Sequence, residues 1–335
     1  MLTLTGDEVR QTADLLAELR GRHRSAEEPE FLLDAPTHAR LLPPRVFGYL
    51  HRLRRTETGF AVISGHPVDE AAVGLTPGHW NEVSRPSPTL DQDLLLVLYA
   101  AVLGDAFGWA TQQDGRIVHD VLPIKEHEGE QLGTAADVLL DWHTEDAFHP
   151  HRPDWVILAC IRNPTLTPTT VALSDDLSLT EEDARVLAQP RFHILPDNSH
   201  LPRNNSASGS ADFGAVQRMR TEPAPVRLLW GDPARPYMRA DPSFWVVSDP
   251  EDAQARGALE RFGAEIERRL RDVVLRPGDF CILDNYKVVH GRKPFAARYD
   301  GTDRWLKRVC VTRDLRKSRG ERADLLSQVL GGAGV

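Results

Sequence analysis

Residues 138–148 have the sequence VLLDWHTEDAF, and residues 280–292 have the sequence FCILDNYKVVHGR. Both stretches contain a short apolar run, which is typical of a buried β-strand. His143 and Glu145 are two positions apart, so an extended chain places both side chains on one face. His290 would arrive from another strand or from its end. The two stretches therefore predict a strand-rich fold that brings two histidines and a carboxylate together.

Two imidazoles and one carboxylate can occupy one face of an octahedral metal ion and leave three positions open. This donor set suits ferrous iron better than magnesium or calcium, and the open positions distinguish it from a structural zinc site. A His-x-Glu pair also arises by chance, and its alternative interpretation is two surface residues of an edge strand. We interpret the remaining histidines of the central region as surface or structural residues: His119, His127, His149, His151, His193 and His200.

Two arginines further along the chain share one strand face. Arg304, Leu306 and Arg308 have the same parity, so a strand points both guanidinium groups to one side. Each guanidinium can bind a carboxylate through two parallel hydrogen bonds. Beside a metal, the pair predicts ligands with two carboxylates, such as a keto acid and an amino acid. The alternative is a solvated basic face, although Trp305 and Val309 on the other side suit a strand with one buried face.

The composition indicates a globular protein with an acidic balance. The chain has 335 residues, of which 41% are hydrophobic and 27% charged, and its net charge is −9. This charge argues against a nucleic-acid surface and is compatible with a small cationic or zwitterionic substrate. The start of the chain lacks a signal-peptide pattern, and no apolar stretch is long enough to span a membrane. Three scattered cysteines suit buried thiols in a reducing compartment. We therefore expect a cytoplasmic protein that binds neither nucleic acid nor membrane.

The pattern along the chain predicts helices first and strands later. Thr5 and Glu8 form a capping-box pattern at the start of a helix, and further helices are expected from Pro44 and over residues 91–102. Short β-like runs begin near residue 107. Residues 191–250 form a long irregular insertion, which is more often a functional lid than an ordinary connection. An amphipathic helix with apolar residues from 259 to 273 and a charged C-terminal helix over residues 314–331 are expected after it.

This order of elements favours a single domain over residues 1–335, mainly β with flanking helices. Its helical N-terminal part would span residues 1–105, and a β-sandwich or jelly-roll core would span about 107–313. No linker divides the chain into two domains.

Several further motifs accompany the two opening stretches: Phe107-Gly108-Trp109 with Gln112-Gln113-Asp114-Gly115, Ala159-Cys160-Ile161-Arg162-Asn163, and Arg304-Trp305-Leu306-Lys307-Arg308. Together the motifs resemble the clavaminate synthase-like branch of the iron(II)/2-oxoglutarate oxygenases. Within it they are most similar to amino-acid hydroxylases related to the arginine β-hydroxylase of viomycin biosynthesis. The resemblance covers roughly Gly59 to Arg313, and Glu145, where most of the superfamily has aspartate, is a mark of this branch. It implies a double-stranded β-helix (cupin-like jelly roll) that uses Fe(II), 2-oxoglutarate and O2.

The resemblance also implies roles for individual residues. Three positions match the metal triad: His143, Glu145 and His290. Arg304 matches the arginine that grips the distal carboxylate of 2-oxoglutarate. Thr170, or Thr169 after a slip of one residue, matches a threonine that helps to hold the cosubstrate.

The substrate end of the site is implied in the same way. Arg308 matches the arginine that meets the substrate α-carboxylate. Gln112 matches a glutamine that touches the α-amino group, and Glu145 would share this contact through its free oxygen.

One stretch departs from the arginine hydroxylases, which grip the guanidinium with an Asp-x-Asp pair. The corresponding residues are Arg239-Ala240-Asp241. Because a carboxylate beside an arginine nearly cancels in charge, burying a guanidinium there would be costly. A neutral ureido group could accept from Arg239 and donate to Asp241, which points to L-citrulline. The alternative is that Arg239 faces solvent and Asp241 alone holds an arginine.

The sequence therefore predicts an iron(II)/2-oxoglutarate-dependent dioxygenase that hydroxylates C3 or C4 of a free L-amino acid. The expected substrate is L-citrulline or L-arginine, and the expected setting is nonribosomal peptide antibiotic biosynthesis. Three alternatives stay open: a desaturase or cyclase of the same family, a zinc hydrolase, and a non-catalytic cupin-like metal-binding protein.

Overall fold

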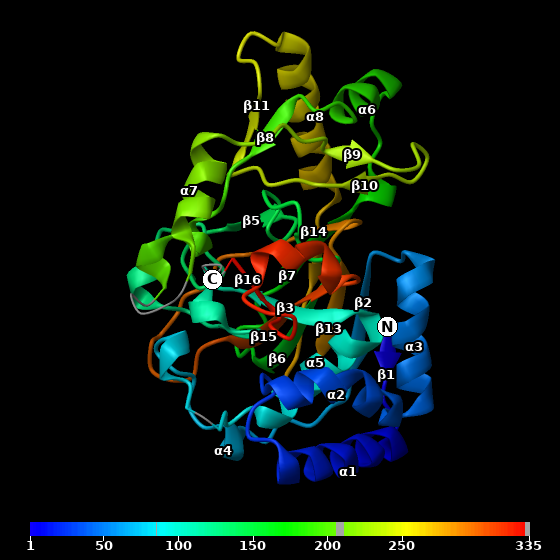
Figure 1. Cartoon of the computed structure of the whole chain (residues 1–335), viewed down its shortest axis with the longest axis vertical. Helices are drawn as coiled ribbons and strands as arrows, with labels where there is room; N and C mark the ends of the chain where they lie inside the picture. The colour runs from blue at the N-terminus through cyan, green and yellow to red at the C-terminus, as the bar shows by residue number, and fades with distance from the viewer. Residues whose placement is uncertain (85, 206–210, 332–335) are drawn as a thin grey trace.

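The computed structural model describes residues 1–84, 86–205 and 211–331 (Figure 1). Its α-helices have the following bounds: α1 (Gly6–Arg22), α2 (Pro29–His38), α3 (Pro44–Thr56), α4 (Glu70–Val73), α5 (Leu90–Leu103), α6 (Glu181–Leu187), α7 (Phe213–Thr221) and α8 (Ala253–Arg269). The expected helices of the N-terminal part are confirmed. At the start of α1, Thr5 accepts from the Glu8 backbone and the Glu8 side chain accepts from the Thr5 backbone.

The strands have the following bounds: β1 (Leu2–Thr3), β2 (Phe60–Ser64), β3 (Asp105–Trp109), β4 (Val118–Val121), β5 (Leu140–His143), β6 (Trp155–Arg162), β7 (Thr169–Leu173), β8 (Phe192–Ile194), β9 (Leu229–Trp230), β10 (Tyr237–Met238), β11 (Trp245–Val247), β12 (Arg271–Val273), β13 (Phe280–Asp284), β14 (Val288–Arg292), β15 (Trp305–Thr312) and β16 (Val329–Leu330). Within the described residues, the larger main sheet has eight strands in the order β1-β2-β13-β6-β15-β3-β16, with β4 also paired to β15. The smaller main sheet has four strands in the order β12-β7-β14-β5.

The two main sheets share one apolar core. This core joins side chains of β2, β6, β13 and β15 in the larger sheet to side chains of β7 and β14 in the smaller sheet. Strand β6 shows how the alternation works, because Val156, Leu158 and Cys160 face the other sheet while Ile157 and Ala159 face the helices. A strand buried on both faces has to be apolar at every position.

Helices cover the outer faces of both sheets. Helix α5 packs on β15 and β6, and α1, α2 and α3 pack around α5. Because α5 is apolar around almost its whole circumference, it is stable only when it is buried on all sides. On the opposite side, α8 packs on β7 and α6 packs on α8. The metal-site strands β5 and β14 thus lie between these two helical layers, as Figure 1 shows.

Two expectations for helices are wrong. Residues 314–331 form a 3-10 helix, η8 (Leu315–Glu321), and then strand β16, which pairs parallel to β3. Backbone pairing with the free edge of β3 replaces helical hydrogen bonds here, and Leu325 and Leu326 stay exposed. Helix α8 ends at Arg269, four residues before the expected end, because the next residues form β12 against β7.

The irregular insertion over residues 191–250 lies beside the end of β5. It contains β8, α7, β9, β10 and β11, together with two 3-10 helices, η6 (Asn198–His200) and η7 (Pro202–Asn204). Residues 206–210 of this expected lid lie outside the described residues. No helix in the described part of the chain is long and apolar enough to span a membrane.

Strand β15 is fixed by a buried ion cluster on its helix-facing side. The ammonium group of Lys307 lies 3.1 Å from a carboxylate oxygen of Asp93 in α5 and 2.7 Å from one of Asp120 in β4. The indole of Trp305 donates to the same oxygen of Asp120 at 2.8 Å. The cluster therefore fixes the strand that carries Arg308 on its other face and that begins directly after Arg304.

We predict that Lys307→Met will lower the free energy of unfolding by about 3–5 kcal/mol, because two buried carboxylates would lose their cation. Chemical denaturation followed by circular dichroism measures this loss. The matched control is Lys293→Met, which removes an exposed pair with Asp272 and should cost no more than about 1 kcal/mol. Equal losses in the two variants would contradict a stabilising role for the cluster.

Candidate active site

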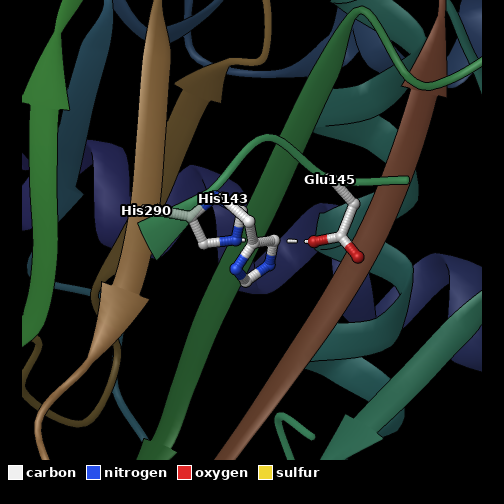
Figure 2. A group of neighbouring side chains, drawn as sticks. All are labelled: His143, Glu145 and His290. Atoms are coloured by element: carbon white, nitrogen blue, oxygen red, sulfur yellow. Dashed lines mark ion pairs between the residues drawn. The ribbon is translucent and has the colours of Figure 1, made fainter. Parts of the chain in front are cut away.

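Two histidines meet across the smaller main sheet. His290 of β14 is paired directly with His143, the last residue of β5, and their rings lie 4.6 Å apart between centroids. Glu145 completes the group, since one ligand atom from each of the three residues lies within 4.8 Å of the others (Figure 2). The expectation that His143 and Glu145 share a strand face is wrong in detail. Strand β5 ends at His143, and Glu145 reaches the site from the turn that follows.

The three side chains fit a metal ion by their chemistry. Nδ1 of His143 donates to the Asp141 carbonyl at 2.8 Å, which leaves its Nε2 free as a ligand. Nδ1 of His290 is buried and has no hydrogen-bond partner among the described residues. Burial opposes ionisation of Glu145, yet Arg308 and His290 lower the pKa of its carboxyl group below the usual range. The group therefore offers an anionic oxygen and imidazole nitrogens to a cation.

Asn285, in the turn between β13 and β14, holds the backbone of Glu145. Its side-chain oxygen accepts from the Glu145 amide at 2.7 Å, and its nitrogen donates to the Glu145 carbonyl at 3.0 Å. The same nitrogen donates to the Pro153 carbonyl at 2.9 Å. These bonds fix Glu145 although it lies outside any strand. They explain how Glu145 can reach the site after β5 has ended.

We predict that Asn285→Ala will weaken Fe(II) binding by about 10- to 100-fold, the usual effect of losing a residue that orients a ligand. Anaerobic titration with Fe(II) measures the affinity. Asn163→Ala is the matched control, because Asn163 makes the same kinds of buried bonds to Thr167 and Leu275 and not to the three residues of the predicted metal site. Similar losses of iron affinity in both variants would contradict a specific role for Asn285.

Arg308 lies at the centre of a polar cluster beside the triad. It donates to a carboxylate oxygen of Glu145, and its other terminal nitrogen donates to Gln112 at 3.1 Å and to Nδ1 of His119 at 2.6 Å. Burial and the neighbouring Arg308 lower the pKa of His119, so its ring is a neutral acceptor. The structure thus brings together Gln112, Glu145 and Arg308, the residues expected at the substrate α-carbon.

Arg304 is a buried cation that forms no ion pair with any residue the structure describes. Its side chain lines the cavity beside the triad and is 5% exposed. Among the described residues it has no ion pair, and its Nε has no hydrogen-bond partner. Burial lowers the pKa of Arg304 to about 10. Because an uncompensated buried charge is costly, this side chain is suited to an anionic ligand.

The cavity has a volume of about 110 Å³, and residues of the insertion form part of its wall. The inner face of β7 contributes Thr169 to its wall, opposite Arg292. Thr170 is paired with Gly291 and therefore faces the other side of the sheet. Of the two positions considered for the cosubstrate threonine, the structure thus brings Thr169 to the cavity and not Thr170.

Arg239 and Asp241 point in different directions. Asp241 lines the cavity, and burial raises the pKa of its carboxyl group to about 7. Arg239 donates to the Ala147 carbonyl and is absent from the cavity wall. Arg239 is buried. Its side chain therefore neither faces solvent nor joins Asp241 in the cavity, which were the two arrangements considered. An arginine–aspartate pair at the side-chain end of the ligand, on which the preference for citrulline depended, is not formed.

Sequence reasoning missed a second carboxylate of the cavity. Asp197 lies at the start of η6 in the insertion and lines the same wall as Asp241. His119 and His200, interpreted as surface or structural, are both buried within the polar network around the site. The irregular segment that carries Asp197 and His200 has no periodicity, so its sequence contains no signal for their direction.

Comparisons with known proteins agree with this geometry. The L-ornithine/L-arginine 3-hydroxylase of Catenulispora acidiphila is 42% identical over 96% of both chains. The enduracididine β-hydroxylase of Streptomyces hygroscopicus is 44% identical over 98% of this chain and 99% of its own. The crystal structure of the non-heme iron oxygenase OrfP with Fe, succinate and (3S)-hydroxy-L-Arg superposes with a TM-score of 0.95. It shares 47% identity over 98% of this chain and 99% of that one.

A family model gives the same classification. The model of the taurine catabolism dioxygenase TauD, TfdA family matches residues 218–310, which include His290, Arg304 and Arg308. The chain belongs to this family of non-haem iron dioxygenases. The resemblance to the clavaminate synthase-like iron(II)/2-oxoglutarate oxygenases is confirmed, and the protein is an enzyme of that class.

Proposed function

We propose that this enzyme hydroxylates C3 of a free L-amino acid that carries a guanidinium group, with L-arginine as the model substrate. The triad of His143, Glu145 and His290 would hold Fe(II), and 2-oxoglutarate and O2 would be the cosubstrates. The choice of C3 is supported by the relatives, whose names describe 3- and β-hydroxylases, and by the hydroxylated arginine bound to OrfP.

The observation that carries this proposal is the guanidinium of Arg304 in the wall of the cavity, which has no ion-pair partner within the described part of the chain. A second carboxylate of a keto acid bound at the metal would neutralise it through two parallel hydrogen bonds. Thr169, on the neighbouring inner face of β7, adds a hydroxyl to this wall. A zinc hydrolase or a non-catalytic metal-binding protein would not require a buried arginine reserved for an anion.

Two carboxylates that the insertion contributes to the cavity favour a substrate with a cationic side chain. Asp197 and Asp241 both line the wall, and Asp197 is among the groups that raise the pKa of Asp241. A guanidinium between them would relieve this repulsion, whereas a neutral ureido group would not. We therefore favour L-arginine over L-citrulline.

The protein side chains would orient the substrate and protect the reaction. Arg308 would bind the α-carboxylate, while Gln112 and the second oxygen of Glu145 would receive the α-amino group. With both ends of the amino acid held, the carbon between them is fixed beside the metal, and such positioning contributes a large part of catalysis. Bound iron, together with O2, would supply the chemistry that removes a hydrogen from an aliphatic carbon and adds oxygen to that carbon.

We also propose that the two main sheets form a double-stranded β-helix. Two facing sheets with one shared core are the layers expected of a double-stranded β-helix (jelly roll) within one domain. The residues of the site lie on the inner face and at one end of these layers, where cupin-like folds hold their metals.

The proposal is tested by anaerobic loading with Fe(II) followed by 2-oxoglutarate, O2 and a panel of amino acids that includes arginine, citrulline, ornithine and lysine. We expect succinate and a product with one added oxygen at C3, formed fastest from L-arginine. Loss of two hydrogens without oxygen gain would instead identify a desaturase. Activity with Zn(II) but not Fe(II), or no turnover with any guanidinium amino acid, would contradict the proposal.

We predict that Arg304→Ala will raise the KM for 2-oxoglutarate by about 100-fold, the usual effect of removing one partner of a buried charge pair. Arg304→Lys keeps the charge but lacks the planar fork, so its KM should be intermediate. Steady-state succinate formation gives both values. An unchanged KM for 2-oxoglutarate in Arg304→Ala would refute the assignment of this side chain.

We predict that Asp241→Asn will raise the KM for L-arginine by about 10- to 100-fold while leaving that for L-citrulline within about threefold, because only the cation loses a charge-assisted partner. Competition between the two amino acids, with products separated by mass spectrometry, measures the change in selectivity. Equal effects on both substrates would show that Asp241 does not contact the guanidinium group.

A further inference from the structure

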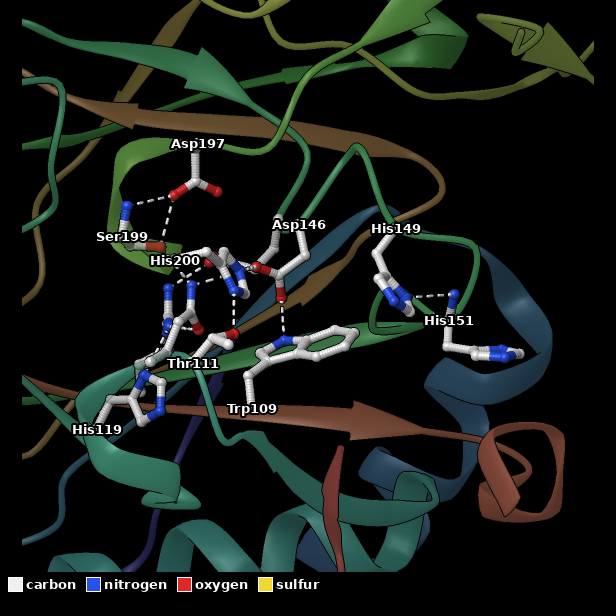
Figure 3. Close-up of polar contacts among 12 residues, drawn as sticks. Trp109, Thr111, His119, Asp146, His149, His151, Asp197, Ser199 and His200 are labelled. Carbon is white, nitrogen blue, oxygen red and sulfur yellow. Dashed lines mark hydrogen bonds and ion pairs between the residues drawn. The ribbon is translucent and has the colours of Figure 1, made fainter. Parts of the chain in front are cut away.

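Asp146 directly follows the metal-binding Glu145 but points into a separate network (Figure 3). Its backbone φ is 48°, in the left-handed region that residues other than glycine seldom adopt. This conformation turns the Asp146 side chain away from the metal cavity while Glu145 faces it. The carboxylate of Asp146 is fully buried.

Three donors converge on the two oxygens of this carboxylate. The indole of Trp109 donates to Oδ2 at 2.6 Å. His200 and Gln112 donate to Oδ1 through their Nε2 atoms, at 3.0 and 3.3 Å. The other ring nitrogen of His200 shares a hydrogen bond of 2.6 Å with the Thr111 hydroxyl. A buried polar network in which every member is satisfied fixes its members rigidly.

Hydrogen bonds link Asp146, through Gln112 and Ser199, to both ends of the proposed amino-acid site. Gln112 bonds Arg308 with its oxygen and the Ser199 hydroxyl with its nitrogen at 2.5 Å. The Ser199 hydroxyl and amide both donate to the Asp197 carboxylate, at 2.5 and 2.8 Å. A chain of hydrogen bonds therefore runs from Asp146 through Gln112, at the α-carbon end, to Asp197 at the guanidinium end.

The same residues could be interpreted as a second metal site, because ligand atoms of Asp146, Asp197 and His200 lie within 4.8 Å of one another. Their hydrogen bonds argue against it. Both oxygens of Asp146 and both nitrogens of His200 already have partners. Binding a cation there would break the contacts that hold Gln112.

We propose that Asp146 is a positioning residue that fixes Gln112 and Asp197 relative to the metal-binding Glu145. It therefore couples recognition of both ends of the amino acid to the metal centre. This inference rests on the proposed function, since it assigns Gln112 and Asp197 to the two ends of the substrate. It predicts that loss of Asp146 impairs amino-acid binding and the use of 2-oxoglutarate for hydroxylation, and not 2-oxoglutarate binding itself.

The first test is Asp146→Asn, which keeps the size of the side chain but leaves one acceptor oxygen for three donors. We expect the KM for L-arginine to rise by about 10- to 100-fold, as for other residues that orient a site, with little change in the KM for 2-oxoglutarate. Succinate should form in excess over hydroxylated arginine, whereas wild type should form the two in equal amounts. The matched control is Asp154→Asn, a buried carboxylate that accepts from the Arg313 amide and has no contact with Gln112 or η6.

The second test is His200→Phe, which keeps the ring that packs edge-on against Trp109 and Phe148 but removes its hydrogen bonds. It should also produce excess succinate, and the double variant should be no worse than Asp146→Asn alone, because the two residues act through one contact. Wild-type ratios of succinate to product in both single variants would overturn the inference. So would equal rises in both KM values, which indicate general damage. Absence of arginine hydroxylation in wild type would instead refute the proposed function.

Discussion

The Glu145 carboxylate is the contact on which the rest of the site depends. One of its oxygens accepts from Arg308, and the other lies 3.4 Å from Nε2 of His290. A single side chain therefore faces both the metal position and the group that would bind the substrate. Any shift of Glu145 would change the metal site and the substrate site together. The surrounding residues prevent such a shift, since Asn285 holds its backbone and the next residue turns the chain into the Asp146 network.

The charges of the cavity are arranged by sign. Arg304 and Arg308 contribute positive charge to the wall, and Asp197 and Asp241 contribute negative charge. A ligand set with two carboxylates near the arginines and a cation near the aspartates would balance these charges. A keto acid together with a basic amino acid has this distribution. The ion cluster of Lys307 lies on the other face of strand β15, which carries Arg308 and begins directly after Arg304. Because Asp93 of this cluster comes from α5, the position of both arginines depends on packing against the N-terminal helices.

Sequence patterns predicted the parts of the molecule in which local periodicity determines structure. The capping box of α1 and the buried helix α5 are confirmed, since each depends on neighbouring residues in one element. Arg304, directly before β15, and Arg308 within it both line the cavity, as their shared parity predicted. The metal triad was also predicted, because His143 and His290 each come shortly after a short apolar run of the sequence. The turn that delivers Glu145 was not foreseen, since it depends on Asn285, which lies 140 residues away.

The failures have a common physical cause. Tertiary pairing with β3 converts the expected C-terminal helix into η8 and β16. The one-residue choice between Thr169 and Thr170 depends on strand register, and a slip of one residue reverses the face. Asp197 comes from an irregular segment, whose direction no periodic pattern determines. The substrate end of the cavity is built from such segments, which explains why the class of enzyme was clearer from sequence than its substrate.

The most direct test is an anaerobic crystal structure of the protein with Fe(II), 2-oxoglutarate and L-arginine. We predict iron on His143, Glu145 and His290, the distal carboxylate of 2-oxoglutarate on Arg304, and the guanidinium group between Asp197 and Asp241. An arginine bound with its guanidinium away from both aspartates, or 2-oxoglutarate bound without contact to Arg304, would contradict this arrangement.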